Sequence, residues 1–220
     1  LGKESQYNCR GVAQWVEPRN TEKSDDADTQ NTSCNIRIIF GTVDFRIFAL
    51  DAKTGQRCED FGENGEVQSD PGKEQVYPGE IQYLMPPAII GDVAVFGSAL
   101  PDYARANGMS GKVRAIDVRS GQTAWEFETI PTAANDPAMQ TWEEGSASST
   151  GGGNVWGHIS VDEQRDLVFL PVSNATADTY GGHRPGNNLY TDSLVALRGS
   201  TGELVWHYQL VHHDLWGWDV

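Results

Sequence analysis

Two side chains that could hold a flat ligand and a cation flank one predicted hairpin. The segment GGGNVWGHISVDEQRDLVFLPVSN carries Trp156 near its start and Asn174 at its end. Apolar residues alternate with polar ones over 156–161, a polar turn follows, and 167–172 form a second strand, so the open ends of this hairpin should meet. An indole face suited to stacking on a planar molecule would then lie near an amide oxygen suited to a hard cation.

Two further segments carry candidate binding residues. Cys9-Arg10-Gly11 opens an element that places a guanidinium beside apolar residues, and its fork of parallel N–H donors matches a carboxylate. A surface salt bridge is the structural alternative for Arg10. Asp102 follows a predicted strand over 93–98 and precedes Ser110-Gly111-Lys112. Its carboxylate could ligate a hard cation or cap the loop.

The other candidates also have structural alternatives. Trp156 could be a core aromatic residue, and Asn174 could form a turn. The glycosylation sequence at 174–176 is interpreted as a coincidence. Near the end of the chain, the adjacent His212, His213 and Asp214 are residue types of metal and acid–base sites. We favour a structural role for this tail.

An internal repeat indicates how these residues are positioned. The motif Ala-Leu-Asp-Ala-Lys-Thr-Gly at 49–55 recurs in similar form at 115–121 and, with Arg198 in place of the Asp, at 196–202. Each copy predicts a strand, a tight turn and a second strand. In the turn, the Asp accepts backbone N–H groups and the Gly supplies a positive φ.

The spacing of this repeat predicts a β-propeller. Its closing glycines lie at 55, 121 and 202, so the units are 66 and 81 residues long (121 − 55 and 202 − 121), against roughly 40–45 for an ordinary blade. The second and third copies place Trp125 and Trp206 four residues after the Gly, where an indole can be wedged between adjacent sheets. We therefore predict an all-β fold, with residues 1–220 forming one partial propeller domain of about three blades and the start of a further one.

Each unit must contain long inserted loops, and loops of that length are usually functional. The candidate insertions are 17–33, 62–79, 101–109, 129–153 and 179–191. The predicted strands are 36–42, 46–51, 56–59, 87–90, 93–98, 112–117, 122–127, 156–161, 167–172, 193–198 and 203–209. No amphipathic helix is predicted.

Composition excludes several functions. With 16 basic and 31 acidic residues the net charge is −15, which argues against a nucleic-acid groove or an anionic membrane surface. No apolar run reaches the roughly 18 residues of a membrane span, and no signal peptide is visible. Because the sequence starts without Met and stops abruptly at WGWDV, it is interpreted as a fragment of a longer protein. The cysteines Cys9, Cys34 and Cys58 lack a CxxC spacing, which argues against zinc. One disulfide with a free thiol and three unpaired thiols both remain open.

These segments together resemble the pyrroloquinoline quinone (PQQ) dehydrogenases. The resemblance implies that Trp156 forms the floor under the quinone, that Arg10 contacts it, and that Asn174 ligates a catalytic calcium. It also implicates Asp102 in metal binding, although the related branch has Asn where this chain has Tyr at the next position. The single Cys9, where methanol-dehydrogenase-like members carry two adjacent cysteines, makes the chain similar to the glucose dehydrogenase branch.

The resemblance implies part of an eight-bladed propeller with tryptophan docking motifs, belonging to a PQQ- and calcium-dependent dehydrogenase of a sugar, polyol or alcohol. Calcium would polarise a quinone carbonyl as a Lewis acid. An Asp beyond residue 220 would take the hydroxyl proton, so no catalytic base is assigned and the fragment alone should be inactive.

Electrons would pass to ubiquinone or cytochrome c in the periplasm, with any membrane attachment through segments absent from this chain. The alternative function is a non-catalytic PQQ-like propeller that acts as a protein-binding scaffold. Such a scaffold has no need of Arg10, Trp156 and Asn174 together.

Overall fold

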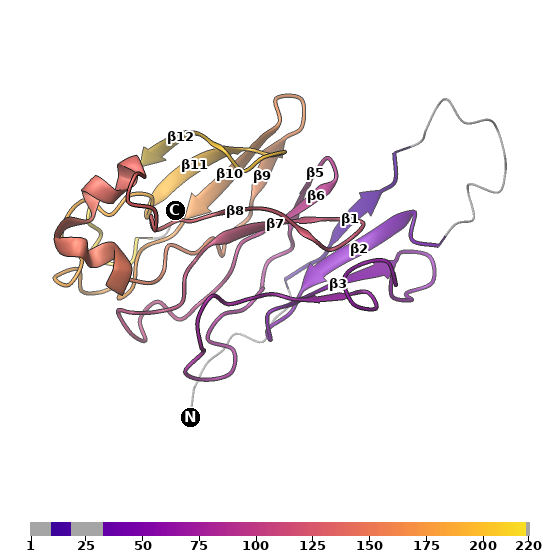
Figure 1. The fold of residues 1–220 in the computed structure, drawn as a ribbon, viewed down its shortest axis with the longest axis horizontal. Coiled ribbons are helices and arrows are strands. Elements are labelled where there is room, and N and C mark those ends of the chain that lie inside the picture. The colour runs from indigo at the N-terminus through magenta and orange to yellow at the C-terminus, as the bar shows by residue number, and fades with distance from the viewer. Residues whose placement is uncertain (1–9, 19–32, 219–220) are drawn as a thin grey trace.

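The computed structural model describes residues 10–18 and 33–218 and, within them, three antiparallel sheets of four strands each (Figure 1). The first sheet contains β1 (Ala13–Val16), β2 (Ile36–Gly41), β3 (Arg46–Asp51) and β4 (Glu66–Gln68). The second contains β5 (Ala88–Ile90), β6 (Val93–Phe96), β7 (Val113–Asp117) and β8 (Thr123–Phe127). The third contains β9 (Ser160–Asp162), β10 (Leu167–Val172), β11 (Ser193–Arg198) and β12 (Leu204–Gln209). Two short 3-10 helices, η2 (Pro137–Thr141) and η3 (Glu143–Ser149), precede the third sheet in sequence.

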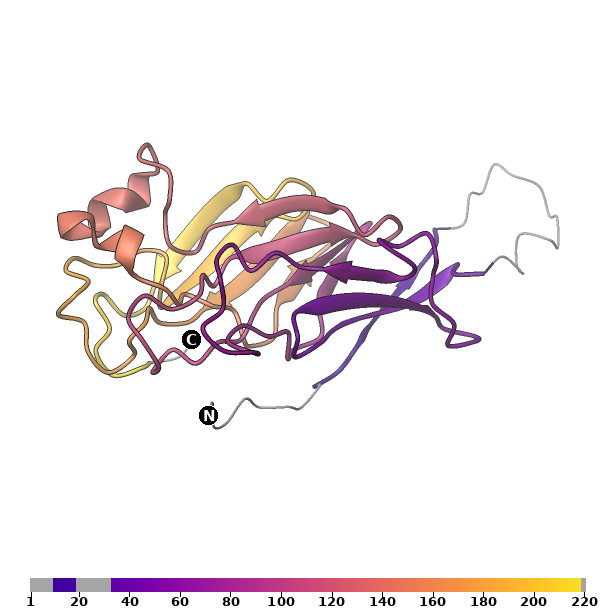
Figure 2. The same ribbon diagram turned by 60° about the horizontal axis from the view of Figure 1, so that its bottom comes forward.

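Each sheet is a meander in which the strands follow one another in chain order. The first strands of the three sheets are neighbours, because β1 lies next to β5 and β5 next to β9. This is the arrangement of blades around an axis. The long connections gather at one end of the sheets, together with η2 and η3 (Figure 2). The three sheets do not close into a ring.

Alternation along the strands buries both faces of the middle sheet. Ala94 and Phe96 pack in the core shared with Ile47 of the first sheet. Val95, which points to the opposite face, packs in the core shared with Leu170 of the third sheet. Each of these five side chains is at most 1 % exposed. The middle sheet is therefore held between its two neighbours.

The repeated motif forms the turn that its sequence predicts. Asp51 accepts hydrogen bonds from the backbone N–H groups of Lys53 and Thr54 at 3.0 and 2.8 Å, and Asp117 repeats this arrangement in the second copy. The closing glycines of the three copies have φ values of +70°, +73° and +75°. These values lie in the left-handed region that glycine adopts most readily.

The third copy replaces the missing carboxylate with one from the neighbouring hairpin. In this copy Arg198 stands where the other two copies have Asp. Asp166 accepts hydrogen bonds from the backbone N–H of Ser200 at 2.9 Å and from its hydroxyl at 2.6 Å. The turn keeps its acceptor although the motif has lost it.

Trp125 joins the second sheet to the third. Its indole N–H donates to the carbonyl of Gly199 at 2.7 Å, and its ring leaves no room for a side chain at Gly202, where a Cβ would lie 2.7 Å from ring atoms. Trp125 thus contacts the third sheet from the second. Trp206 instead packs at a tilt against Phe169 and is 40 % exposed, so within the described residues it is not wedged between two sheets.

Most predicted strands occur, with four corrections. The strand predicted at 56–59 is wrong, because only an isolated bridge between Leu50 and Arg57 forms there and β4 pairs with β3 instead. β1 was not predicted. The insertion at 129–153 contains η2 and η3, where no helix was expected; Asp136 caps η2 by accepting the N–H of Ala138. β9 runs from 160 to 162, so only residues 160 and 161 of the strand predicted at 156–161 belong to it.

The buried carboxylate of Asp51 makes the stability of the fold depend on pH in the acid range. The backbone N–H of Cys34, which donates at 2.6 Å, is the main cause that lowers the pKa of Asp51 from 3.8 to about 2. A lowered folded-state pKa gives stability that is complete above pH 4 and is lost as the pH falls toward 2. We expect Asp51→Asn to lower the free energy of unfolding by about 1–3 kcal/mol at neutral pH, with the difference from wild type shrinking below pH 4.

Urea denaturation across this pH range measures the effect. Asp70→Asn is the control, because Asp70 is an exposed turn residue whose carboxylate accepts one backbone N–H, from Gly72. A difference for Asp51→Asn that stays constant down to pH 2 would contradict the assigned ionisation.

Candidate functional site

Arg10 and Trp156 meet across the molecule. The guanidinium carbon of Arg10 lies 5.8 Å from the centre of the Trp156 ring, within the range of a cation–π contact. The backbone N–H of Arg10 donates to the carbonyl of Leu84 at 3.0 Å, which fixes the chain just before β1. Arg10 is exposed and Trp156 is half-buried, so a cation and an aromatic face lie together at the surface.

Asn154 links the Trp156 segment to the second sheet and to the β10–β11 loop. Its side-chain amide donates to the carbonyl of Ser98 at 3.3 Å, and its own carbonyl accepts the N–H of Ser173 at 2.9 Å. The N–H of Gly153 donates to the carbonyl of Asn174 at 2.8 Å. These bonds and the Arg10–Trp156 contact link the segments that carry five residues, which we call the strand-end cluster: Arg10, Ser98, Asn154, Trp156 and Asn174.

The predicted hairpin exists, although its ladder is short. β9 pairs with β10 from Asp162 to Ser160 only. Continuing that register would place Pro171 opposite His158, and proline has no N–H to donate to a ladder. The open ends nevertheless meet, through the bond between Asn154 and Ser173.

Asn174 is buried and held at both ends of its amide. Its Oδ1 accepts from the hydroxyl of Ser173 at 3.0 Å, and its Nδ2 donates to the carbonyl of Ala175 at 3.2 Å. The side chain is 1 % exposed. An amide oxygen has two lone pairs, so Oδ1 can still bind a cation.

Two buried polar atoms of the cluster have no hydrogen-bond partner among the described residues. They are the hydroxyl of Ser98 and Oδ1 of Asn154, both in residues that are 1 % exposed. Buried polar atoms are normally hydrogen-bonded, and leaving one unpaired costs about 1–3 kcal/mol. The arrangement therefore fits a polar ligand at this point. Neither Ser98 nor Asn154 was predicted from the sequence as a site residue. A polar residue just after an apolar strand, as in Gly97-Ser98, is a signal that could have identified Ser98.

Asp102 belongs to the loop 97–112, which also contains Ser98, and it is half-buried. This loop is braced from the preceding connection by two charged side chains. The buried carboxylate of Glu80 accepts from Nε of Arg105 at 2.6 Å, and the ammonium of Lys73 donates to Asn107 Oδ1 at 2.9 Å. The brace gives the loop a defined shape. Metal binding by Asp102 stays a prediction.

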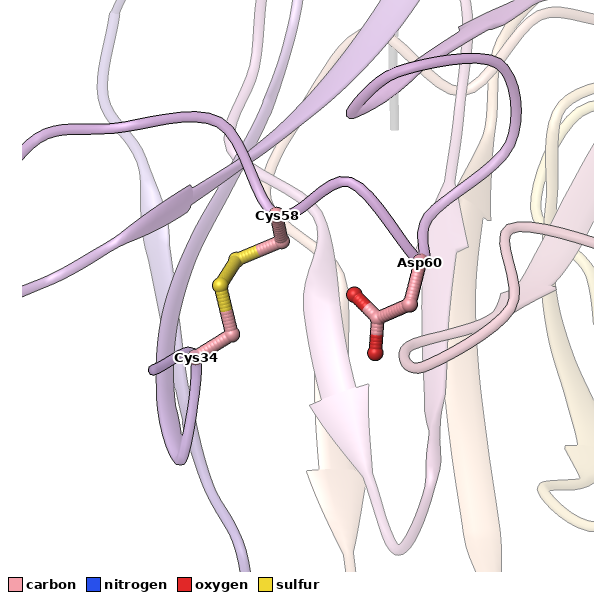
Figure 3. A group of neighbouring side chains, drawn as sticks. All are labelled: Cys34, Cys58 and Asp60. Atoms are coloured by element: carbon pink, nitrogen blue, oxygen red, sulfur yellow. A yellow bond between two sulfur atoms is a disulfide. The ribbon is translucent and has the colours of Figure 1, made fainter. Parts of the chain in front are cut away.

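Cys34, Cys58 and Asp60 form the one group of His, Cys, Asp or Glu side chains among the described residues that lies close enough to hold a metal. The two sulfur atoms are joined in a disulfide, as Figure 3 shows. A metal-binding cysteine must be a thiolate, so the disulfide excludes this site. Asp60 instead pairs with Arg37 at 2.5 Å. Cys9 lies outside the described residues.

Glycines allow backbones to touch around the cluster. A Cβ at Gly97 would lie 2.0 Å from the carbonyl oxygen of Val155, and one at Gly152 would lie 2.6 Å from the N–H of Thr176. Gly151 likewise lies against the backbone of Gly108, so these glycines make room for neighbouring protein backbone.

The fold defines part of a propeller, and the strand-end cluster lies among the connections between its strands. A family model described as "PQQ: Glucose/ethanol/alcohol dehydrogenase, beta-propeller domain" matches residues 2–220. The chain belongs to this family, and the predicted all-β propeller fragment is confirmed. Within the described residues no helix is long and apolar enough to cross a bilayer.

Individual relatives agree with this assignment. The chain is 33 % identical over 216 residues to quinoprotein glucose dehydrogenase A of Acinetobacter calcoaceticus, covering 96 % of this chain and 26 % of the relative. It is 35 % identical over 221 residues to the quinate/shikimate dehydrogenase (quinone) of Acinetobacter baylyi, covering 96 % of this chain and 27 % of the relative.

The structure of a quinohemoprotein alcohol dehydrogenase from Pseudomonas putida HK5 matches with a TM-score of 0.69 at 27 % identity, over 83 % of this chain and 26 % of that one. The chain thus spans about a quarter of the length of these relatives.

The backbone contact at Gly97 can be tested with a matched pair of glycines. Gly97→Ala should lower the free energy of unfolding by about 1–3 kcal/mol or more, because the new methyl group overlaps a backbone carbonyl that cannot easily move. Gly157→Ala should change stability by roughly 0.5 kcal/mol or less, because its Cβ would meet Pro171 at an ordinary 3.5 Å. Chemical denaturation of both variants provides the measurement, and equal effects would contradict the argument.

Proposed function

We propose that this chain forms part of the catalytic propeller of a PQQ- and calcium-dependent dehydrogenase that oxidises a sugar, polyol or alcohol. The observation that carries the proposal is the strand-end cluster, in which Arg10 lies over Trp156 beside the unpaired polar atoms of Ser98 and Asn154. A scaffold propeller needs none of these features at one place. Quinoprotein and alcohol dehydrogenases among the relatives support the same reaction class.

The exposed half of the cluster suits a flat polycarboxylate. The guanidinium of Arg10 offers parallel donors to one of the three carboxylates of PQQ. Trp156 offers a ring face for stacking. Ser98 and Asn154 offer a hydroxyl and an amide oxygen to the polar edge of the ligand. When bound, PQQ supplies the acceptor for the two electrons removed from the substrate.

Asn174 and Asp102 are the residues that we propose for calcium. Both offer oxygen ligands, which calcium prefers, and calcium takes six to eight of them, so backbone, cofactor and further oxygens must complete the shell. Asn174 is the stronger candidate because its amide is fixed by hydrogen bonds on both sides. None of the residues proposed for PQQ or calcium is proposed as the proton acceptor.

The remaining assignments follow from the compartment and the relatives. The disulfide between Cys34 and Cys58 is typical of an oxidising compartment, which supports a periplasmic location. We propose ubiquinone or a cytochrome c as the electron acceptor, with membrane attachment through segments outside this chain. Relatives named as glucose, glycerol and quinate/shikimate dehydrogenases support a small polyhydroxy substrate.

Replacing Trp156 tests the stacking surface. We expect Trp156→Ala in the full-length protein to weaken PQQ binding by about 1–3 kcal/mol, or roughly 5- to 150-fold in Kd, because a flat ring loses its platform. Trp156→Phe should retain part of the affinity. Trp206→Ala is the control, because Trp206 packs at a tilt against Phe169 and lies outside the strand-end cluster. Calorimetric titration with PQQ measures all three, and unchanged affinity in Trp156→Ala would refute the stacking role.

Replacing Asn174 tests the metal ligand. Asn174→Ala should raise the calcium concentration required for half-maximal PQQ binding by about tenfold or more, because one oxygen ligand is removed. Asn174→Asp keeps an oxygen at that position and should leave the requirement near wild type or lower. Equal losses in both variants would indicate that the amide serves the fold and not the cation.

A further inference from the structure

A fully buried arginine stands in the β10–β11 loop that begins at Ser173 and Asn174. Arg184 is 0 % exposed. Its Nη1 donates to Oδ1 of Asn188 at 3.0 Å, and its Nη2 donates to the backbone carbonyl of Asp214 at 2.6 Å. The first bond lies within the β10–β11 loop, whereas the second reaches the segment that follows β12. Arg184 therefore joins two separate loops at the end of the third sheet.

Three carboxylates balance the buried charge. Asp192, Asp214 and Asp178 all attract the guanidinium of Arg184. Asp192 is 0 % and Asp214 is 1 % exposed. Charges buried this deeply are tolerated only when they are paired and hydrogen-bonded. Loss of the guanidinium would leave these carboxylates without their cation. We therefore expect a substitution at Arg184 to destabilise the loops around it.

The segment after β12 is shaped by the residue that Arg184 holds. The carboxylate of Asp214 accepts the backbone N–H groups of Trp216, Gly217 and Trp218 at 3.3, 2.8 and 3.2 Å. These three bonds fold residues 214–218 into a turn, which we call the Asp214 turn. Because Arg184 binds the carbonyl of Asp214 itself, it fixes the base of this turn.

The Asp214 turn is anchored against the loop that carries Asn174. A Cβ at Gly217 would lie 3.5 Å from that of Asp178, and the ring of His213 contacts Asn188 at 3.1 Å. Arg184 also donates to the carbonyl of Ala177 at 3.4 Å. Asp178 and Ala177 follow Asn174 closely in sequence, so the turn and the strand-end cluster share one loop as their support.

We propose that Arg184 is a positioning residue that holds the Asp214 turn and the Asn174 loop in one fixed arrangement beside the strand-end cluster. The inference rests on the proposed function, because the arrangement matters for binding only if the cluster takes PQQ and calcium. It also gives the His-His-Asp tail of the sequence a role. Asp214 acts there as a structural acceptor held by an arginine, in line with the structural role that we favoured for the tail.

Hydrogen exchange in the cofactor-free protein tests the structural half of this proposal. Arg184→Gln should speed exchange of the amides of 216–218 by about tenfold or more, because the base of their turn is released. Arg37→Gln is the matched control. Arg37 is also buried, 4 % exposed, and donates to the carbonyls of Cys34 and Arg119, but it lies in the first sheet. Arg37→Gln should leave the exchange rates of the amides of 216–218 unchanged, even if both variants melt at a lower temperature.

PQQ titration with calcium tests the functional half on the same variants of the full-length protein. We expect Kd to rise about tenfold or more in Arg184→Gln and to stay within about twofold in Arg37→Gln. Arg184→Lys, which keeps the charge but not the fork of donors, should lie between wild type and Arg184→Gln. Added guanidinium at millimolar concentration should restore binding to Arg184→Ala and leave the affinity of Arg37→Ala unchanged.

Two results would overturn the proposal. One is wild-type exchange at 216–218 in Arg184→Gln. The other is an equal loss of PQQ affinity in Arg184→Gln and Arg37→Gln, which would mean that general instability causes both losses. If the wild-type protein itself binds no PQQ, the proposed function fails, and the exchange comparison still decides whether Arg184 holds the Asp214 turn.

Discussion

Burial of both faces of the middle sheet is the constraint on which the remaining structure depends. A four-stranded meander cannot cover its own two faces, so β5–β8 is stable only between two neighbouring sheets. Phe96 faces one neighbour and Val95 the other, which leaves the first strands of all three sheets side by side. The cluster follows from this packing. Arg10 precedes β1, Ser98 follows β6 and Trp156 precedes β9, so none of the sheets could supply these residues alone.

Electrostatics set a second condition on the site. The chain carries a net charge of −15, so an anionic ligand is repelled at long range. At physiological ionic strength that field decays over about 8 Å. Inside this distance the local groups decide, and the cluster offers the guanidinium of Arg10 and the hydroxyl of Ser98. A calcium ion beside Asn174 would add positive charge at the same place. Cofactor and cation should therefore favour each other's binding.

Much of the fold could be predicted from local sequence because its signals are local. Alternating strands and the Asp–Gly turns at Asp51 and Asp117 depend on a few neighbouring residues, and they occur as predicted. The partners that come from distant segments could not be predicted. Asp166 takes over the turn of the third copy, and β4 replaces the strand expected at 56–59, because both depend on which hairpins lie together in space. For the site, Arg10 and Trp156 were expected to contact one ligand, and they lie close together in the fold. Ser98 and Asn154 could not be predicted, because only the folded chain shows which buried atoms lack partners.

The distribution of buried polar groups separates stability from function in this chain. The faces between sheets are mostly apolar, with Arg37 and Arg114 as buried exceptions, while buried Asn154, Asn174, Arg184 and Asp214 lie outside the strands. Burying such groups costs free energy unless each finds a partner. Nη1 and Nη2 of Arg184 and the carboxylate of Asp214 have partners within the protein, which keeps the loops in one shape. The unpaired atoms of Ser98 and Asn154 lie next to this rigid network, and a ligand binds more tightly to groups that are already held in place. Rigid polar loops around a few unpaired atoms are the arrangement expected of a binding site and not of a core.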